Sequence, residues 1–179
     1  MNEILKKSSI LFKNDEIISA ISSLAKSCNE HFHQLEKKVT VLPVMKGAIP
    51  FAGHLIPKLN FELIIDYIHA TRYLQNKGTA NLQYIYEPQV ETIINKDILL
   101  LDDILDEGIT LLNLKSKLID VGANSVMTAV LFDKNLQKRK PLEADFVGLE
   151  VPNKYVFGFG LDFKGRGRNL PHLYAYNEK

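Results

Sequence analysis

Residues 98–110 decide how this chain folds, and they read Ile98-Leu99-Leu100-Leu101-Asp102-Asp103-Ile104-Leu105-Asp106-Glu107-Gly108-Ile109-Thr110. An apolar run without polar alternation is typical of a strand that is buried on both faces of a parallel sheet. Open α/β sheets bind ligands at the C-terminal ends of such strands, and this strand carries three aspartates to that place. Gly108 permits a tight turn, and residues 110–121 predict a helix whose unpaired first amides suit a phosphate. The stretch therefore predicts a site for a sugar phosphate and a divalent metal.

Three other interpretations of the acidic residues stay open at this point. The spacing of Asp102, Asp103 and Asp106 also matches the aspartate-rich motif of prenyl diphosphate synthases, in which the acids lie on a helix of an all-helical protein. Paired acids at strand ends also occur in phospho-acceptor receiver domains, which leaves the long second half of this chain unexplained. The acids could instead simply solvate a loop. The apolar residues before them and the glycine turn after them favour the strand-end site.

The composition is that of an ordinary globular domain. The chain has 179 residues, 46% hydrophobic and 24% charged, which suits one domain with a substantial core. The formal net charge of +1 gives no bulk attraction to nucleic acid or to an anionic membrane, so we expect neither partner. No apolar stretch is long enough to span a bilayer and the first residues lack a signal-peptide core, so we expect a cytoplasmic protein. The single cysteine, Cys28, lies in an apolar helical stripe and is expected in the core.

Hydrophobic periodicity predicts alternating strands and helices between residues 39 and 132. Helices are expected over residues 15–37, with Asn14 as N-cap, over 48–59 after a Met45-Lys46-Gly47 turn, and over 110–121, with Gly122 ending the last. Besides the strand in the 98–110 run, strands are expected over residues 39–44, 61–69, 82–86, 125–132, 147–151 and 156–159. The polar residues 70–81 predict a mobile loop or a flexible hairpin. The pattern predicts an α/β fold with a central, mostly parallel sheet flanked by helices.

The motifs resemble, in order, those of the type I phosphoribosyltransferases, and among these the hypoxanthine-guanine branch. Beyond the 98–110 run, the matching segments are Met45-Lys46-Gly47, His69-Ala70-Thr71-Arg72-Tyr73, Lys134, Asp145-Phe146-Val147-Gly148, Val151-Pro152-Asn153-Lys154-Tyr155-Val156, Leu161-Asp162-Phe163 and Arg168. The resemblance implies one domain, residues 1–179, with a core over about residues 36–145 and a small hood formed by residues 146–179 with the N-terminal region. It also implies a homodimer or homotetramer.

The activity implied by the resemblance is purine salvage. A 5-phosphoribosyl group passes, with Mg²⁺, from phosphoribosyl pyrophosphate to hypoxanthine or guanine, giving the purine nucleoside monophosphates IMP or GMP and pyrophosphate. The transition state resembles an oxocarbenium ion with a departing anion, so cationic groups and a metal are needed at the leaving group. Xanthine, adenine and orotate enzymes are the alternatives, together with a nucleotide-sensing regulator on the same fold. Lys134 and the Tyr155-Val156 segment disfavour adenine and orotate, and the balanced charge disfavours an RNA-binding regulator.

The resemblance assigns roles to individual residues. Asp106 matches the catalytic base, which takes the proton from purine N7 or forms a hydrogen bond with it. The phosphoribosyl group and its 5′-phosphate are expected at Asp102, Asp103, Ile104, Leu105, Asp106, Glu107, Gly108, Ile109 and Thr110. Pyrophosphate is expected at Lys46, Gly47 and Arg168, and Mg²⁺ at Asp102, Asp103 and Asp162. The 6-oxopurine base is expected at Lys134, Lys154, Tyr155 and Val156, under a lid that carries Arg72 and Tyr73.

Glu107 and Arg72 depart from the pattern of the family. Relatives usually carry threonine or serine in place of Glu107, so this carboxylate must point away from a bound phosphate that would repel it. Ile109 likewise lacks the polar side chain that some relatives have there. Many relatives have serine before the lid tyrosine, where this chain has Arg72, which would contact pyrophosphate or face solvent. The resemblance further implies a non-proline cis peptide at the Lys46 turn.

Overall fold

The computed structural model describes residues 1–33, 38–74 and 80–177 of the chain. Its helices are α1 (Asn2–Lys6), α2 (Asn14–Phe32), α3 (Ile49–Leu55) and α4 (Ile109–Val121), with the short 3-10 helices η1 (Ile56–Lys58) and η2 (Val90–Thr92). Its strands are β1 (Ser8–Phe12), β2 (Val39–Met45), β3 (Leu63–Ile65), β4 (Ile68–Leu74), β5 (Ala80–Tyr86), β6 (Asp97–Leu105), β7 (Ser125–Asn135), β8 (Phe146–Pro152), β9 (Val156–Phe157) and β10 (Leu173–Tyr176).

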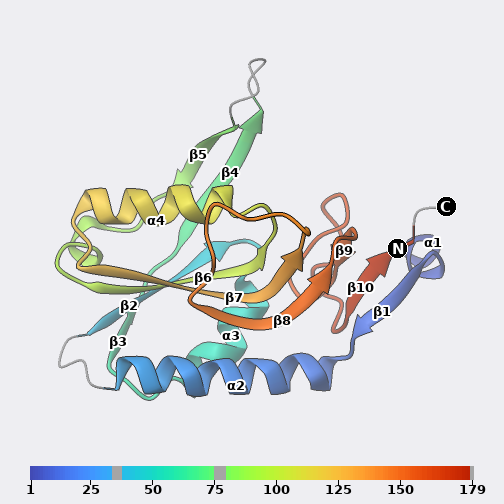
Figure 1. Ribbon diagram of the computed structural model, residues 1–179, viewed down its shortest axis with the longest axis horizontal. Helices are drawn as coiled ribbons and strands as arrows, with labels where there is room; N and C mark the ends of the chain where they lie inside the picture. Colours follow the sequence, from blue (N-terminus) through green and yellow to red (C-terminus); the bar gives the residue numbers. More distant parts are fainter. Residues whose placement is uncertain (34–37, 75–79, 178–179) are drawn as a thin grey trace.

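A large sheet with the strand order β5-β4-β2-β6-β7-β8 forms the centre of the molecule, and β3 joins it beside β2. All its pairs are parallel except β4 with β5, which form an antiparallel hairpin. The helix α4 lies over one face of the sheet, and α2 and α3 lie over the other (Figure 1). This arrangement confirms the predicted α/β class with a mostly parallel sheet between helices.

The strand β6 is buried on both faces, as its uninterrupted apolar sequence predicts. Leu99 and Leu101 pack into a core cluster with α2 and α3, whereas Ile98 and Leu100 pack into a second cluster with α4. Because successive side chains of a strand point to opposite faces, one apolar run supplies both cores. Because β6 also pairs with β2 on one side and with β7 on the other, the position of its acidic C-terminal end is fixed by both neighbours.

The predicted strand over residues 61–69 is wrong, because two strands, β3 and β4, replace it. The strand is interrupted at Asp66. The Asp66 carboxylate accepts hydrogen bonds from the amides of Tyr67 and Gln89 and from the hydroxyls of Tyr86 and Thr92. Side-chain acceptors that hold nearby amides compete with a continuous ladder. Both strands still pair with β2, β3 along its first residues and β4 along its last.

Other boundaries differ by smaller amounts. The helix α2 starts at Asn14 with Lys13 as its N-cap, so Asn14 is not the cap, and residues 34–37 of the predicted helix lie outside the described residues. The helix expected over residues 48–59 is α3 followed by η1, because Pro57 has no amide hydrogen to continue the α-helical pattern. Residues 70–81 contribute to the β4–β5 hairpin, which confirms the hairpin interpretation, and residues 75–79 are not described.

A small sheet with the order β1-β10-β9 lies beside the large one and joins the beginning of the chain to its end (Figure 1). The expected division between core and hood at residues 145 and 146 does not coincide with the sheets, because β8 pairs with β7 in the large sheet. The small sheet instead gathers β1 with the segments that follow β8. Among the described residues, no helix is both long and apolar enough to cross a membrane.

Candidate active site

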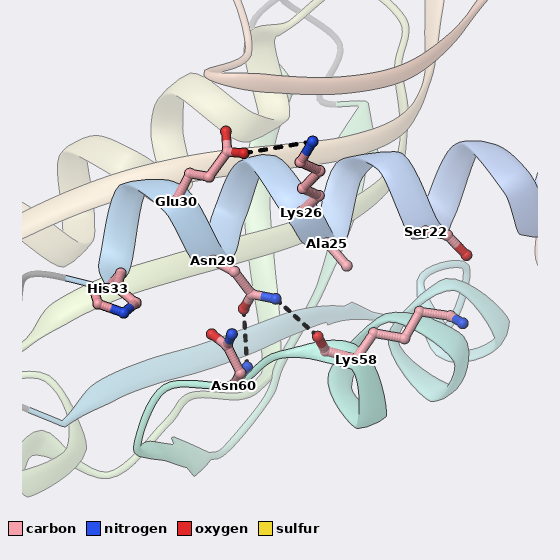
Figure 2. Close-up of a pocket in the computed structure, with 8 residues that line it drawn as sticks. All are labelled: Ser22, Ala25, Lys26, Asn29, Glu30, His33, Lys58 and Asn60. Atoms are coloured by element: carbon pink, nitrogen blue, oxygen red, sulfur yellow. Dashed lines mark hydrogen bonds and ion pairs between the residues drawn. The ribbon is translucent and has the colours of Figure 1, made fainter.

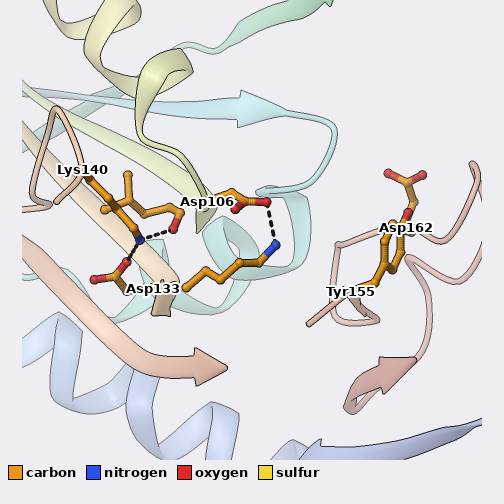
Figure 3. Close-up of polar contacts among 7 residues, drawn as sticks. Asp106, Asp133, Lys140, Tyr155 and Asp162 are labelled. Atoms are coloured by element: carbon orange, nitrogen blue, oxygen red, sulfur yellow. Dashed lines mark hydrogen bonds and ion pairs between the residues drawn. The ribbon is translucent and has the colours of Figure 1, made fainter. Parts of the chain in front are cut away.

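The end of β6 lies beside β7, and the two strands place two predicted site residues in contact. Leu105 and Asp133 form their last register pair. Just beyond it, the Nζ atom of Lys134 lies 2.6 Å from Oδ2 of Asp106, the contact drawn in Figure 3. The Lys134 side chain is only 12% exposed, whereas that of Asp106 is 44% exposed. A mostly buried lysine side chain thus holds a carboxylate that still faces solvent.

The turn after Asp106 leads directly into α4. Gly108 is the N-cap of this helix, with φ of 79°, a left-handed conformation that glycine adopts without steric cost. Gly108 has no side chain that could cap the first amides of α4. The first amides of the helix, together with its dipole, are therefore suited to an anion. Glu107 is exposed, and Thr110 is half-buried.

Asp103 lies against the turn that follows β2, and Asp102 precedes it on β6. The Asp103 amide donates a hydrogen bond of 3.0 Å to Oδ1 of Asp102. A Cβ atom built on Gly47 would lie 1.7 Å from Oδ2 of Asp103, so the turn rests directly on this carboxylate. The Met45–Lys46 peptide is cis, as the resemblance implied, and the Lys46 side chain is exposed.

Burial raises the pKa of Asp103 above its ordinary value, because desolvation disfavours the charged carboxylate. Hydrogen bonding with the Asp102 side chain and the positive charge of Arg168 act against this rise. A desolvated carboxylate next to a second carboxylate gains from any cation that arrives between them. The electrostatics of this pair therefore suit a cationic ligand.

The hood contacts the same turn from the other side. A Cβ atom on Gly160, where φ is 101°, would lie 2.1 Å from the carbonyl oxygen of Gly47, so the two backbones touch. The Arg168 guanidinium donates a hydrogen bond of 2.7 Å to the Gly160 carbonyl and pairs with the Asp162 carboxylate. The structure thus brings Gly47 and Arg168, both predicted for pyrophosphate, to the neighbourhood of Asp103.

The three predicted metal ligands do not form a ready-made cage. Across residues 1–33, 38–74 and 80–177, no group of three His, Cys, Asp or Glu side chains could hold a metal ion. Asp162 contacts Arg168 and accepts a hydrogen bond of 2.7 Å from the Gly165 amide. Mg²⁺ is usually bound by one or two carboxylates, several waters and the phosphates of the substrate, so Asp102 and Asp103 alone fit that chemistry. The role of Asp162 as a ligand stays a prediction.

Three of the residues predicted for the base share one pocket. Lys134, Lys154 and Tyr155 line a cavity of about 420 Å³ with Asn153, Tyr176 and Asn177. Tyr155 is 46% exposed, and its hydroxyl donates a hydrogen bond of 3.2 Å to the carbonyl of Asp162. Val156 is buried and pairs with Ala175 in the small sheet, so the sheet uses part of its backbone.

The predicted lid residues Arg72 and Tyr73 belong to β4, opposite Leu82 and Asn81 of β5. Their side chains are not described, and residues 75–79, which connect the two strands, lie outside the described residues. The lid function of this hairpin therefore stays a prediction.

Two residues of the site were not predicted from the sequence. The Nζ atom of Lys140 donates a hydrogen bond of 2.7 Å to the Leu105 carbonyl and pairs with the Asp133 carboxylate (Figure 3). Asp133 precedes Lys134 directly, which is a signal that could have drawn attention to it. Lys140 gave no such signal, because the run Lys138-Arg139-Lys140 looks like an ordinary solvated loop.

A larger hollow of about 640 Å³ lies elsewhere, between α2 and the segment after α3. It is lined by Ser22, Ala25, Lys26, Asn29, Glu30, His33, Lys58 and Asn60 (Figure 2). The Asn29 side chain donates a hydrogen bond to the Lys58 carbonyl and accepts one from the Asn60 amide. None of the predicted site residues lines it, so we do not place the chemistry there.

Comparisons with known proteins agree with this geometry. Residues 7–164 match the phosphoribosyl transferase domain family. The chain is 31% identical over 176 residues to a hypoxanthine-guanine phosphoribosyltransferase of Aquifex aeolicus, covering 97% of each chain. It is also 31% identical over 170 residues to the enzyme of that name from Streptococcus thermophilus, covering 95% of this chain and 93% of that one.

Solved structures show the same relationship. A hypoxanthine phosphoribosyltransferase of Staphylococcus aureus superposes with a TM-score of 0.85 at 27% identity, covering 94% of this chain and 90% of that one. A hypoxanthine-guanine phosphoribosyltransferase of Bacillus anthracis gives a TM-score of 0.82 at 26% identity, with 94% and 98% covered. The chain therefore belongs to the type I phosphoribosyltransferase family.

Proposed function

We propose that this protein is a purine salvage enzyme that transfers the 5-phosphoribosyl group of phosphoribosyl pyrophosphate to hypoxanthine or guanine. In this reaction purine N9 forms a bond to the anomeric carbon of the sugar, and the bond from that carbon to the pyrophosphate oxygen breaks. The products are IMP or GMP and pyrophosphate. The observation that carries the proposal is the contact between Lys134 and Asp106, which joins a hydrogen-bond donor for a 6-oxo group to an acceptor for a purine proton.

Lys134 supports the choice of a 6-oxopurine. Its ammonium group is nearly buried and can only donate hydrogen bonds, so it matches the 6-oxo oxygen of hypoxanthine or guanine. The 6-amino group of adenine offers it no comparable acceptor, and a buried donor left unpaired is costly. The base then lies in the pocket of Lys134, Lys154 and Tyr155, with the Tyr155 ring stacked on it.

Asp106 takes the purine proton in this proposal. Its carboxylate is partly exposed, and a proton acceptor positioned within hydrogen-bond reach accelerates such a step. As the base arrives, Lys134 turns from Asp106 toward the 6-oxo group, and Asp106 gains the proton from N7. The neighbouring amides of residues 106–110 hold the 5′-phosphate at the start of α4.

The opposite side of the site receives pyrophosphate and Mg²⁺. Lys46, the Gly47 amide and Arg168 supply positive charge and donors to the leaving group, close to Asp103. Asp102 and Asp103 would hold Mg²⁺, whose charge neutralises the departing pyrophosphate when it is bound. The hairpin of β4 and β5 carries Arg72 and Tyr73 and closes over the sugar to exclude water.

We include a homodimer or homotetramer and a cytoplasmic location in the proposal. The exposed apolar side chains Ile65, Tyr67 and Ile85, on or beside β3, β4 and β5, support an association between copies. Light scattering after size-exclusion chromatography tests the proposed oligomer, and a monomer at micromolar concentration would refute it.

A substrate panel tests the proposed reaction directly. The protein is mixed with phosphoribosyl pyrophosphate, MgCl₂ and, in turn, hypoxanthine, guanine, xanthine, adenine and orotate, and nucleotide and pyrophosphate are measured together. We expect stoichiometric IMP or GMP and pyrophosphate, and loss of both when EDTA replaces MgCl₂. Turnover of adenine or orotate alone, or no turnover of any base, would refute the proposal.

A further inference from the structure

Lys140 is mostly buried beside the proposed site, although Lys138 and Arg139 in the same loop are exposed. Its side chain is 10% exposed, whereas Lys138 and Arg139 face solvent. The Nζ atom donates a hydrogen bond of 2.7 Å to the Leu105 carbonyl and pairs with Asp133. Burying an ammonium group costs free energy that an exposed loop lysine does not lose. A simple solvated loop therefore does not explain its position.

Both partners of Lys140 stand next to residues with proposed roles in the reaction. Leu105 and Asp133 are the last register pair of β6 and β7, and the residues that follow them are Asp106 and Lys134. The Leu105 carbonyl and the Asp106 amide belong to one planar peptide unit. A donor that holds the carbonyl therefore also fixes the direction of the Asp106 amide, the first amide of the phosphate loop.

We propose that Lys140 is a positioning residue that orients the peptide between Leu105 and Asp106 and so shapes the binding site for the 5′-phosphate. It links Leu105, the last residue of β6, to Asp133 of β7, next to Asp106 and Lys134. In this role Lys140 acts through the Leu105 carbonyl and needs no contact with the substrate. This inference rests on the proposed function, since it assigns the loop to a phosphorylated ligand.

Binding measurements on Lys140→Met test the role of the hydrogen bond. Methionine keeps the length and burial of the side chain but lacks the donor and the charge. Calorimetry with IMP and with inosine gives two dissociation constants. The inosine constant divided by the IMP constant measures what the 5′-phosphate contributes to binding. We expect this ratio to fall about tenfold in Lys140→Met, the factor that corresponds to one charge-assisted hydrogen bond. The matched control Lys138→Met, in the same loop but exposed, should leave it unchanged.

Two further variants separate positioning from stability. Lys140→Met leaves Asp133 without its ion-pair partner and is expected to lower the melting temperature. The double variant Asp133→Asn with Lys140→Met removes both charges, so we expect it to recover part of that melting temperature while the phosphate contribution stays low. Lys140→Arg keeps a donor and is expected to recover part of the phosphate contribution.

The outcomes are distinct for the two proposals. If the wild-type protein binds neither IMP nor inosine and forms no nucleotide, the proposed function fails and this inference fails with it. If the wild type binds IMP and Lys140→Met keeps the wild-type ratio, only the role of Lys140 is refuted. A double variant that recovers both the melting temperature and the ratio would also refute it, because the residue would then serve stability alone.

Discussion

Replacing Asp106 with asparagine should separate the chemistry of the site from its shape. Asparagine keeps the size of the side chain and an oxygen that can accept from Lys134, whose Nζ atom lies 2.6 Å from the Asp106 carboxylate. It cannot take a proton from purine N7. We therefore expect turnover to fall while the binding of IMP is largely preserved, because the groups that hold phosphate and base remain in place.

The expected sizes of these effects follow from the geometry. Loss of a positioned proton acceptor lowers the rate of the chemical step by about 10²- to 10⁴-fold. The cost in stability is smaller, since the Asp106 side chain is 44% exposed and water screens its attraction to Lys134. We expect a loss of about 1 kcal/mol, within the range of partly exposed ion pairs. For a domain of this size that corresponds to a melting temperature lower by about 2–4 °C.

Single-turnover kinetics with hypoxanthine and phosphoribosyl pyrophosphate give the rate of the chemical step without product release. Calorimetry with IMP measures binding, and thermal melting measures stability. The control is Asp120→Asn, an exposed aspartate on α4, which should behave as wild type in all three measurements. A single-turnover rate of Asp106→Asn within a factor of about two of the wild type would refute the role of Asp106.

Three further substitutions probe other parts of the site. Gly47→Ala places a Cβ atom 1.7 Å from Oδ2 of Asp103 and should raise KM for phosphoribosyl pyrophosphate more than about tenfold, whereas Gly53→Ala, whose Cβ meets open space, should not. Asp103→Asn removes a carboxylate whose pKa burial raises, so it should raise the melting temperature of the metal-free protein near pH 8, while activity falls. The difference in melting temperature between Asp103→Asn and the wild type should shrink as the pH falls through the raised pKa toward 3.8, because wild-type Asp103 then becomes neutral. A difference that stays constant with pH would contradict this prediction. Lys134→Ala should weaken the preference for hypoxanthine over adenine by about tenfold in kcat/KM, and an unchanged preference would exclude Lys134 from the base site.

The central part of the fold could be predicted because one short stretch supplies side chains to both core clusters. Leu99 and Leu101 alternate with Ile98 and Leu100 along β6, so the apolar run itself indicates a strand between two layers of helices. The acidic residues and Gly108 that follow predict where a phosphate binds. These signals are local in the sequence and need no knowledge of distant contacts.

The features that escaped prediction depend on contacts between distant segments. The break at Asp66 requires Gln89 and Thr92, which lie more than twenty residues further along the chain. The meeting of Gly160 with the Gly47 carbonyl brings the hood onto the turn after β2, and neither glycine shows this by itself. The local sequence also places Lys140 in a basic loop, and its burial appears only when β6 and β7 lie side by side.

A crystal structure of the protein with bound IMP is the most direct test of where the reaction takes place. We expect the 5′-phosphate on the amides of residues 106–110, the purine between Lys134 and Tyr155, and Asp106 within hydrogen-bond distance of N7. A nucleotide bound in another cavity, or bound with its phosphate away from the start of α4, would contradict the assignment of this site.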